Sequence, residues 1–194
     1  MDGVRRRRFP VGRVLAVAAL LALAVATPAL VRAQAARMVP AERATELADA
    51  MLIAAVARHG PLCEPREARP AIARLTDAVA PASPPRLRIV PLGKPVAIAL
   101  PGATVLVDRT LAATDPDAAI AAARKALGTD AVADLMRGAG VLGSLRYLFT
   151  GRISDATLQR ATEAAIAAAP PAPQTAHPAP YADKDRAALA KACG

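Results

Sequence analysis

Apolar residues along the chain follow two different spacings, and their order predicts the elements of the fold. A recurrence every three or four residues is typical of amphipathic helices. This spacing predicts helices at residues 41–58, 66–80, 117–127, 130–137, 141–150, 154–168 and 183–192. Short β-rich runs separated by proline and glycine predict strands at residues 87–92, 96–100 and 104–107. We therefore expect an α+β protein, mostly helical, with a small antiparallel sheet of about three short strands.

The helix predicted at residues 117–127 has well-marked ends. Either Thr114 or Asp115 can cap its first N–H groups, and Pro116 is suited to its first turn. Asp117 places a negative charge near the positive end of the helix dipole. Gly128 follows the last apolar residue, so we expect the helix to end there.

Residues 1–35 have the three-part composition of a secretory signal peptide. Arg5–Arg8 is cationic, and Val14–Ala26 is an unbroken apolar run. Pro28 and the small residues that end at Ala35 then favour cleavage by signal peptidase. The alternative is that an 18-residue apolar stretch is retained as a membrane anchor. Both readings predict export, to the periplasm or to the outer face of the inner membrane of a bacterium.

The rest of the chain divides by composition into three parts. Residues 36–169 are long enough to bury a modest core and form the predicted α+β domain. Residues 170–181 form a Pro-rich linker that we expect to be extended or disordered. Residues 182–194 contain the last short helix.

The charge balance argues against nucleic acid as a partner. The chain has a formal net charge of +9, but residues 1–35 contain six arginines and one aspartate, which leaves +4 for the remainder. These basic residues form no run, and the whole chain has only two Tyr, two Phe and no Trp. Nucleic-acid binders concentrate basic residues on one face and use aromatic side chains for stacking on single strands. We predict no nucleic-acid binding.

Cys63 and Cys193 are the only cysteines, and an even number in an exported chain favours a disulfide over two free thiols. Such a bond would tie the C-terminal end to the start of the α+β domain. A zinc site built from both cysteines together with His59 and His177 is the alternative, but its spacing matches no common zinc site.

An apolar strand, a Pro-Gly corner, a second strand and a helix follow one another between Val96 and Leu127. This order resembles the active-site region of the HtpX-like and prenyl-protease-like zinc metallopeptidases of bacterial envelopes. VAIALPG at Val96–Gly102 is similar to the family's strand, which reads approximately NAFALPGG. The resemblance covers about residues 41–150 and the C-terminal tail. It implies a truncated metallopeptidase-like fold, with this strand beside the helix that would carry HExxH.

The zinc-binding side chains of that family are absent from the matching positions. KALGT stands in place of HELGH, so Lys125 and Thr129 replace the two histidine ligands and Ala126 replaces the general base. A lysine ammonium repels zinc, and alanine cannot accept a proton. The family's third ligand is a glutamate from a later helix, where this chain offers only Glu163. We therefore predict no catalytic residue and no cofactor; zinc is expected only if its ligands come from elsewhere or from a partner.

Three hypotheses of function follow. The first is a non-catalytic, metallopeptidase-like envelope protein that binds a polypeptide or an envelope partner by adding it to a strand edge. That edge would consist of Val96, Ala97, Ile98, Ala99, Leu100, Pro101 and Gly102, which could instead form a buried core strand. The second is an active zinc metalloendopeptidase with non-standard ligands. The third is a small exported structural or adaptor domain unrelated to peptidases.

Overall fold

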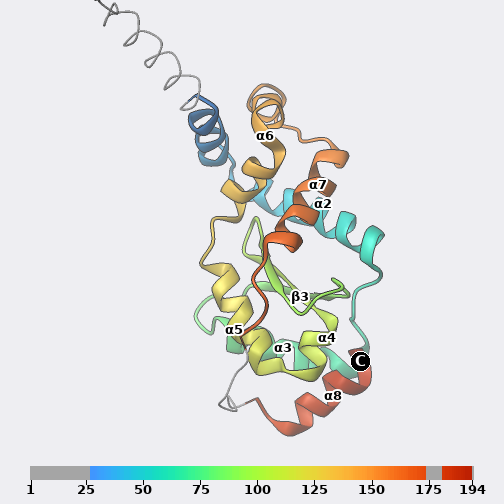
Figure 1. Cartoon of the computed structure of the whole chain (residues 1–194). Coiled ribbons are helices and arrows are strands. Elements are labelled where there is room, and N and C mark those ends of the chain that lie inside the picture. The colour runs from blue at the N-terminus through green and yellow to red at the C-terminus, as the bar shows by residue number, and fades with distance from the viewer. Residues whose placement is uncertain (1–26, 174–180, 194) are drawn as a thin grey trace, which may run out of the picture.

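The computed structural model describes residues 27–173 and 181–193, so most of the predicted signal peptide lies outside the described residues. A small sheet lies between two groups of helices (Figure 1). One face is covered by α2 (Ala41–His59), α6 (Ala131–Thr150) and α7 (Asp155–Ala168). The other is covered by the 3₁₀ turn η1 (Arg66–Ala68), α3 (Arg69–Val79), α4 (Arg109–Thr114), α5 (Pro116–Leu127) and α8 (Asp183–Cys193). The predicted α+β class, mostly helical with three short strands, is confirmed.

The sheet is mixed, which corrects the prediction that it is antiparallel. Its strands are β1 (Arg86–Val90), β2 (Ala97–Leu100) and β3 (Thr104–Asp108), in the order β1-β3-β2. β2 and β3 form an antiparallel hairpin, whereas β1 and β3 are parallel. The prediction assumed that neighbours in sequence are neighbours in the sheet. Here the hairpin docks with β3 against β1, so β3 takes the central position, where it is buried along its whole length.

Side-chain alternation along β3 divides the core into two halves. Val105 and Val107 point towards α3, α5 and α8, whereas Leu106 points towards α2 and α7. Both halves are rich in alanine, which lets helices approach the sheet and one another closely. At Gly138, for example, an added Cβ would lie 3.0 Å from the Cβ of Ala161, so α6 and α7 pack at short range there.

Local capping explains the turn from β3 into the helices. Asp115 accepts a hydrogen bond from the N–H of Ala118 at 2.9 Å, so the predicted cap of α5 is confirmed. The sequence did not reveal α4, which has only six residues. Its cap is Asp108, whose carboxylate accepts from the N–H of Leu111 at 3.1 Å and from the N–H of Leu92 at 2.9 Å.

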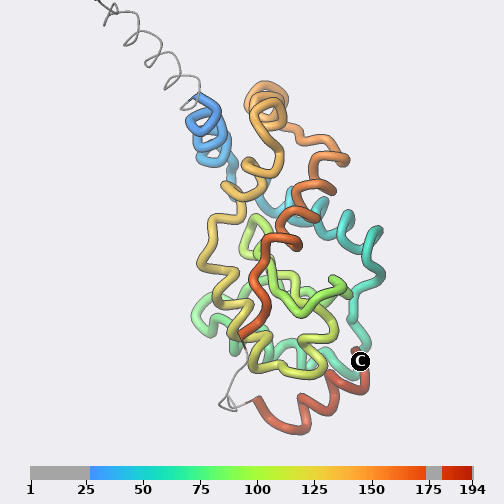
Figure 2. Tube along the Cα trace, in the orientation of Figure 1, coloured from blue at the N-terminus to red at the C-terminus, as the bar shows by residue number. Residues whose placement is uncertain are grey.

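Helix α6 changes direction at Gly140, where the backbone has φ 71° and ψ −175°. The kink separates two helical halves at the place where the sequence predicts two helices. The Ser144 hydroxyl donates to the carbonyl of Gly140 at 2.8 Å and lies 3.2 Å from the carbonyl of Met136, so its contacts span the kink. The second half of α6 lies at the end of the molecule beside the helical residues 27–37 (Figures 1 and 2).

A disulfide bond holds the C-terminal helix to the rest of the protein. Cys63 and Cys193 form a disulfide with a Cα–Cα distance of 5.6 Å, which confirms the predicted pair. This bond also excludes the alternative zinc site, because neither sulfur is left as a free thiolate ligand.

Among the described residues, no helix is long and apolar enough to cross a membrane.

Candidate functional site

A cavity of about 400 Å³ opens along the outer edge of β2. Its walls come from α5 on one side and from α6 and α7 on the other, because the sheet ends at β2 between the two helical layers. Ten of its 21 lining residues are alanine. These small side chains leave room that larger ones would fill, and they make the cavity predominantly apolar.

The backbone of β2 presents unpaired hydrogen-bonding groups to this cavity. Asp108 donates its N–H to the carbonyl of Val96 at 2.9 Å, which makes this opposite pair a hydrogen-bonded one. Such pairs alternate along an antiparallel ladder, so the next one is Ile98 with Leu106. The N–H and C=O groups of Ala97 and Ala99 therefore point away from β3. No backbone partner from outside the sheet reaches them within the described part of the chain.

The two ends of the predicted edge have other surroundings. Val96 and Leu100 are each 1% exposed and belong to the core between the sheet and α2. These two residues therefore agree with the alternative prediction of a buried core strand. Pro101 and Gly102 form the hairpin turn, where Gly102 has φ 67° and approaches the backbone of Thr45. Only Ala97, Ile98 and Ala99 line the cavity.

The last turn of α5 and the residues just after it bring to the same cavity the three positions that the resemblance assigns to two zinc ligands and a base. Lys125, Ala126 and Thr129 all line it, opposite the edge of β2. Ala126 is buried, whereas Lys125 and Thr129 are exposed. The Thr129 hydroxyl donates to the carbonyl of Ala126 at 2.7 Å, and Lys125 forms no ion pair with any described residue.

These residues do not fit a zinc ion. An ammonium group, a methyl group and a hydroxyl that already donates to a backbone carbonyl provide none of the imidazole, thiolate or carboxylate ligands that zinc requires. Across residues 27–173 and 181–193, no cluster of three or more His, Cys, Asp or Glu side chains has the geometry to hold a metal.

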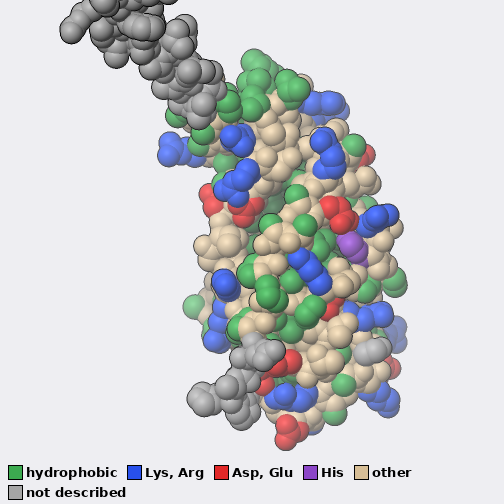
Figure 3. All heavy atoms as spheres, viewed as in Figure 1, with side chains coloured by type: hydrophobic (Ala, Val, Ile, Leu, Met, Phe, Trp, Pro, Cys, Tyr) green, Lys and Arg blue, Asp and Glu red, His purple; other side chains and the backbone are tan. Residues whose placement is uncertain are grey.

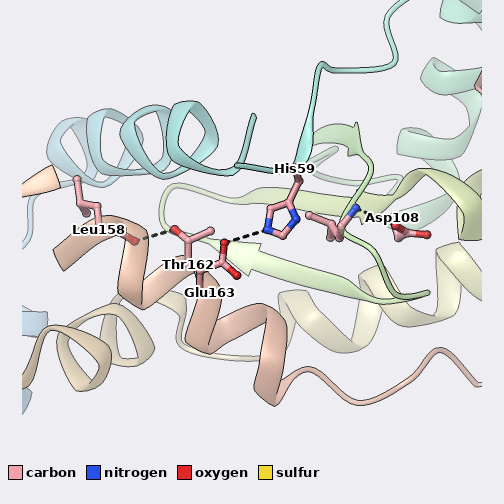
Figure 4. A network of polar contacts seen from close by, with 6 residues as sticks. His59, Asp108, Leu158, Thr162 and Glu163 are labelled. Carbon is pink, nitrogen blue, oxygen red and sulfur yellow. Dashed lines mark hydrogen bonds and ion pairs between the residues drawn. The ribbon is translucent and has the colours of Figure 1, made fainter. Parts of the chain in front are cut away.

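Glu163, the sequence candidate for a third ligand, is turned away from the cavity. Its Oε1 lies 3.0 Å from Nε2 of His59, so the contact joins α7 to the end of α2 (Figure 4). Neither residue lines the cavity. The neighbouring Thr162 donates to the carbonyl of Leu158 within α7, at 2.9 Å. His59 and Glu163 therefore have a structural role in packing α2 against α7. His177 lies outside the described residues.

The start of the Pro-rich linker forms part of the cavity rim, which the sequence did not reveal. We call residues 169–173 the Pro-rich segment. The N–H of Ala172 donates to the carbonyl of Pro95 at 3.1 Å, just before β2 begins. Lys94 fixes the approach to this segment, because its Nζ donates to the carbonyl of Ala167 at 2.9 Å. Pro170, Pro171 and Pro173 line the cavity.

A second polar cluster, distant in sequence, lies where α8 docks. Arg186 donates to Asp117 at 2.7 Å, and Arg74 pairs with Asp185; both carboxylates are 3% exposed. The Tyr181 hydroxyl donates to the carbonyl of Ala71 at 2.6 Å. Burial of the ring, followed by the nearby charge of Asp185, raises the pKa of Tyr181 well above its usual value. Asp117 therefore has two roles: it is the buried ion-pair partner of Arg186, and it places a negative charge near the positive end of the α5 dipole.

Comparison with known proteins gives no match: no protein-family model, no curated protein and no solved structure is similar to this chain.

Proposed function

We propose that this chain is an exported, non-catalytic, metallopeptidase-like protein that binds an extended polypeptide along the outer edge of β2. One observation carries the proposal: the unpaired N–H and C=O groups of Ala97 and Ala99 face an apolar cavity. A peptide strand at this edge would complete the ladder, and its alternate side chains would enter the space between α5 and α7. The small lining residues favour a ligand whose own side chains are apolar.

The position of β2 beside α5 also supports the proposal, through the metallopeptidase resemblance. The family requires the strand that matches β2 to lie beside the helix that carries the metal ligands, and here α5 packs against β2. The substitution of both ligand positions and of the general base is the ground for proposing binding without cleavage. The disulfide indicates a non-reducing compartment outside the cytosol. The periplasm is the location we propose within that class.

Proline at position 99 tests the edge directly. The Ala99 N–H points away from β3, so Ala99→Pro removes the outward donor without removing a hydrogen bond of the sheet. The probe is a fluorescein-labelled peptide of alternating alanine and valine, and binding is followed by fluorescence anisotropy. We expect the affinity of Ala99→Pro to fall roughly tenfold or more, because one hydrogen bond is lost and the proline ring obstructs the edge.

Ala99→Ser is the matched control, because serine keeps the N–H and is nearly as small as alanine. It should bind the probe within about twofold of the unmodified chain. Equal affinity of the proline and serine variants would contradict binding at this edge. If the unmodified chain fails to bind, the hypothesis of a structural or adaptor domain gains support. Mass spectrometry of the probe after incubation with zinc tests catalysis, and cleavage that a chelator abolishes would overturn the non-catalytic part of the proposal.

A further inference from the structure

The second half of α6 carries an outward stripe of large apolar side chains. Phe149 is 85% exposed and Leu142 is 84% exposed, and their spacing of seven residues places them on one face of the helix. Leu145 lies between them and is half-buried. Tyr147 and Ser144 fill the inward face, so core packing does not account for the outward stripe. Figure 3 shows hydrophobic side chains gathered at this end of the molecule.

The surroundings of the stripe are basic. Residues 135–154 contain three arginines and no acidic residue, and residues 27–41 contain two arginines and no acidic residue. Arg146 and Arg152 are exposed on either side of Phe149 in the sequence, and Arg37 is exposed in the segment that packs with Tyr147. None of these three forms an ion pair with a described residue. An apolar strip bordered by unpaired cations is complementary to an anionic lipid surface.

The position of the segment before α2 also supports a membrane surface as the partner. Ala35, Ala36 and Val39 pack against the stripe's own helix, where Ala35 forms a small core with Met136 and Tyr147; Figure 2 shows this segment beside that helix. The apolar run Val14–Ala26 directly precedes them in the sequence. The first described residues therefore lie at the same end of the molecule as the stripe, and an apolar export segment before them would hold this end near the bilayer.

We propose that the face formed by Leu142, Leu145, Arg146, Phe149 and Arg152 docks on an anionic membrane surface. Phe149 and the leucines enter the headgroup boundary, while the arginines contact lipid phosphates. All five residues remain whether or not the segment before residue 36 is removed. The edge of β2 and its cavity are built from other residues, so this face leaves the polypeptide site open.

Tryptophan fluorescence can locate the docking face, because the chain contains no Trp. Phe149→Trp places the only indole within the stripe, and phosphatidylglycerol-containing vesicles are the probe. We expect a blue shift of its emission and quenching by brominated lipid. Ile53→Trp is the control, because Ile53 is 69% exposed but belongs to α2 and is not a residue of the stripe. Its emission should not change with either addition.

The charge requirement is tested by Arg146→Gln combined with Arg152→Gln in the Phe149→Trp background. Partitioning into anionic vesicles should weaken about fivefold for each arginine removed, and the difference should diminish at high salt. Three results would overturn the proposal: unchanged emission of Phe149→Trp with vesicles, equal partitioning into purely zwitterionic vesicles, or a similar shift for Ile53→Trp. A concentration-dependent blue shift without lipid would instead assign the face to a second copy of the chain.

Discussion

At the scale of single residues, the cavity contains the positions that the proposed metallopeptidase resemblance assigns to an active site, but not the side chains of that family's site. Lys125, Ala126 and Thr129 line it at the positions that the resemblance assigns to two ligands and a base. The carboxylate that could complete a metal site, Glu163, contacts His59 on the other side of α7 instead. The site therefore lacks both histidine ligands, the general base and the third ligand, and no single substitution would restore it.

This deficiency predicts the outcome of a triple substitution. Lys125→His and Ala126→Glu in the last turn of α5, together with Thr129→His two residues beyond its end, would bring two imidazoles to the cavity. We expect weak zinc binding without full occupancy, because the third protein ligand is missing. The measurement is zinc content after gel filtration in a metal-buffered solution. Stoichiometric, tightly held zinc in the variant would show that another residue supplies the third ligand.

At the scale of elements, the Pro-rich segment occupies one end of the proposed peptide edge. Ala172 donates to the carbonyl of Pro95, which lies on the same outward side of the chain as Ala97 and Ala99. The prolines on either side of Ala172 have no N–H, so they cannot extend this pairing along β2. One hydrogen bond of the chain itself thus stands where an incoming strand would form one.

Ala172→Pro should free that end of the edge. The variant loses the bond to Pro95, which contributes about 1 kcal/mol, so the alternating alanine-valine probe should bind up to about fivefold more tightly. Pro173→Ala is the control, because it keeps the N–H of Ala172 and should leave the affinity close to that of the unmodified chain. Anisotropy titrations of both variants provide the comparison. Weaker binding by Ala172→Pro would show that the Pro-rich segment supports the peptide site.

The sequence predicted the elements better than their assembly, for a physical reason. Periodicity and capping are local, so α2, α5, α7 and the hairpin of β2 and β3 could be recognised from neighbouring residues alone. α4 escaped because six residues are too few to establish a helical period. The parallel pairing of β1 with β3 depends on how the hairpin docks, which no residue near β1 encodes. The strand in the cavity was predicted, but its walls required α6, α7 and the Pro-rich segment to meet.

At the scale of the whole molecule, α8 completes the half of the core that lies between the sheet and helices α3, α4 and α5. The disulfide joins residues separated by 130 positions. In the loop-entropy model it lowers the conformational entropy of the unfolded chain and thereby stabilises the fold by about 5 kcal/mol at most. Two ion pairs with nearly buried carboxylates add specificity to the docking position. The helix thus stabilises α3 and α5, and α5 in turn forms one wall of the cavity.

Tyr181 makes this docking sensitive to alkaline pH. Its pKa is raised in the folded state, chiefly by burial, so the folded chain holds its proton at a pH where the unfolded chain loses it. Below the unfolded pKa of about 10, both states are protonated and the full stability is present. Above it, the free energy of unfolding should fall with pH, by at most about 1.4 kcal/mol per pH unit for this one group.

Urea unfolding at pH 8 and above pH 10, with the disulfide intact, measures this dependence. Tyr181→Phe keeps the ring but removes the ionisable hydroxyl, so it should lower stability at pH 8 by about 1 kcal/mol, through loss of the bond to Ala71, and flatten the alkaline decline. Tyr147→Phe is the matched variant, because burial also raises the pKa of Tyr147, but this residue lies on α6 in the small core with Ala35 and Met136, outside the α8 contact. It should preserve the part of the decline due to Tyr181. If Tyr181→Phe declined as steeply as the unmodified chain, the alkaline sensitivity would belong to groups outside the α8 contact.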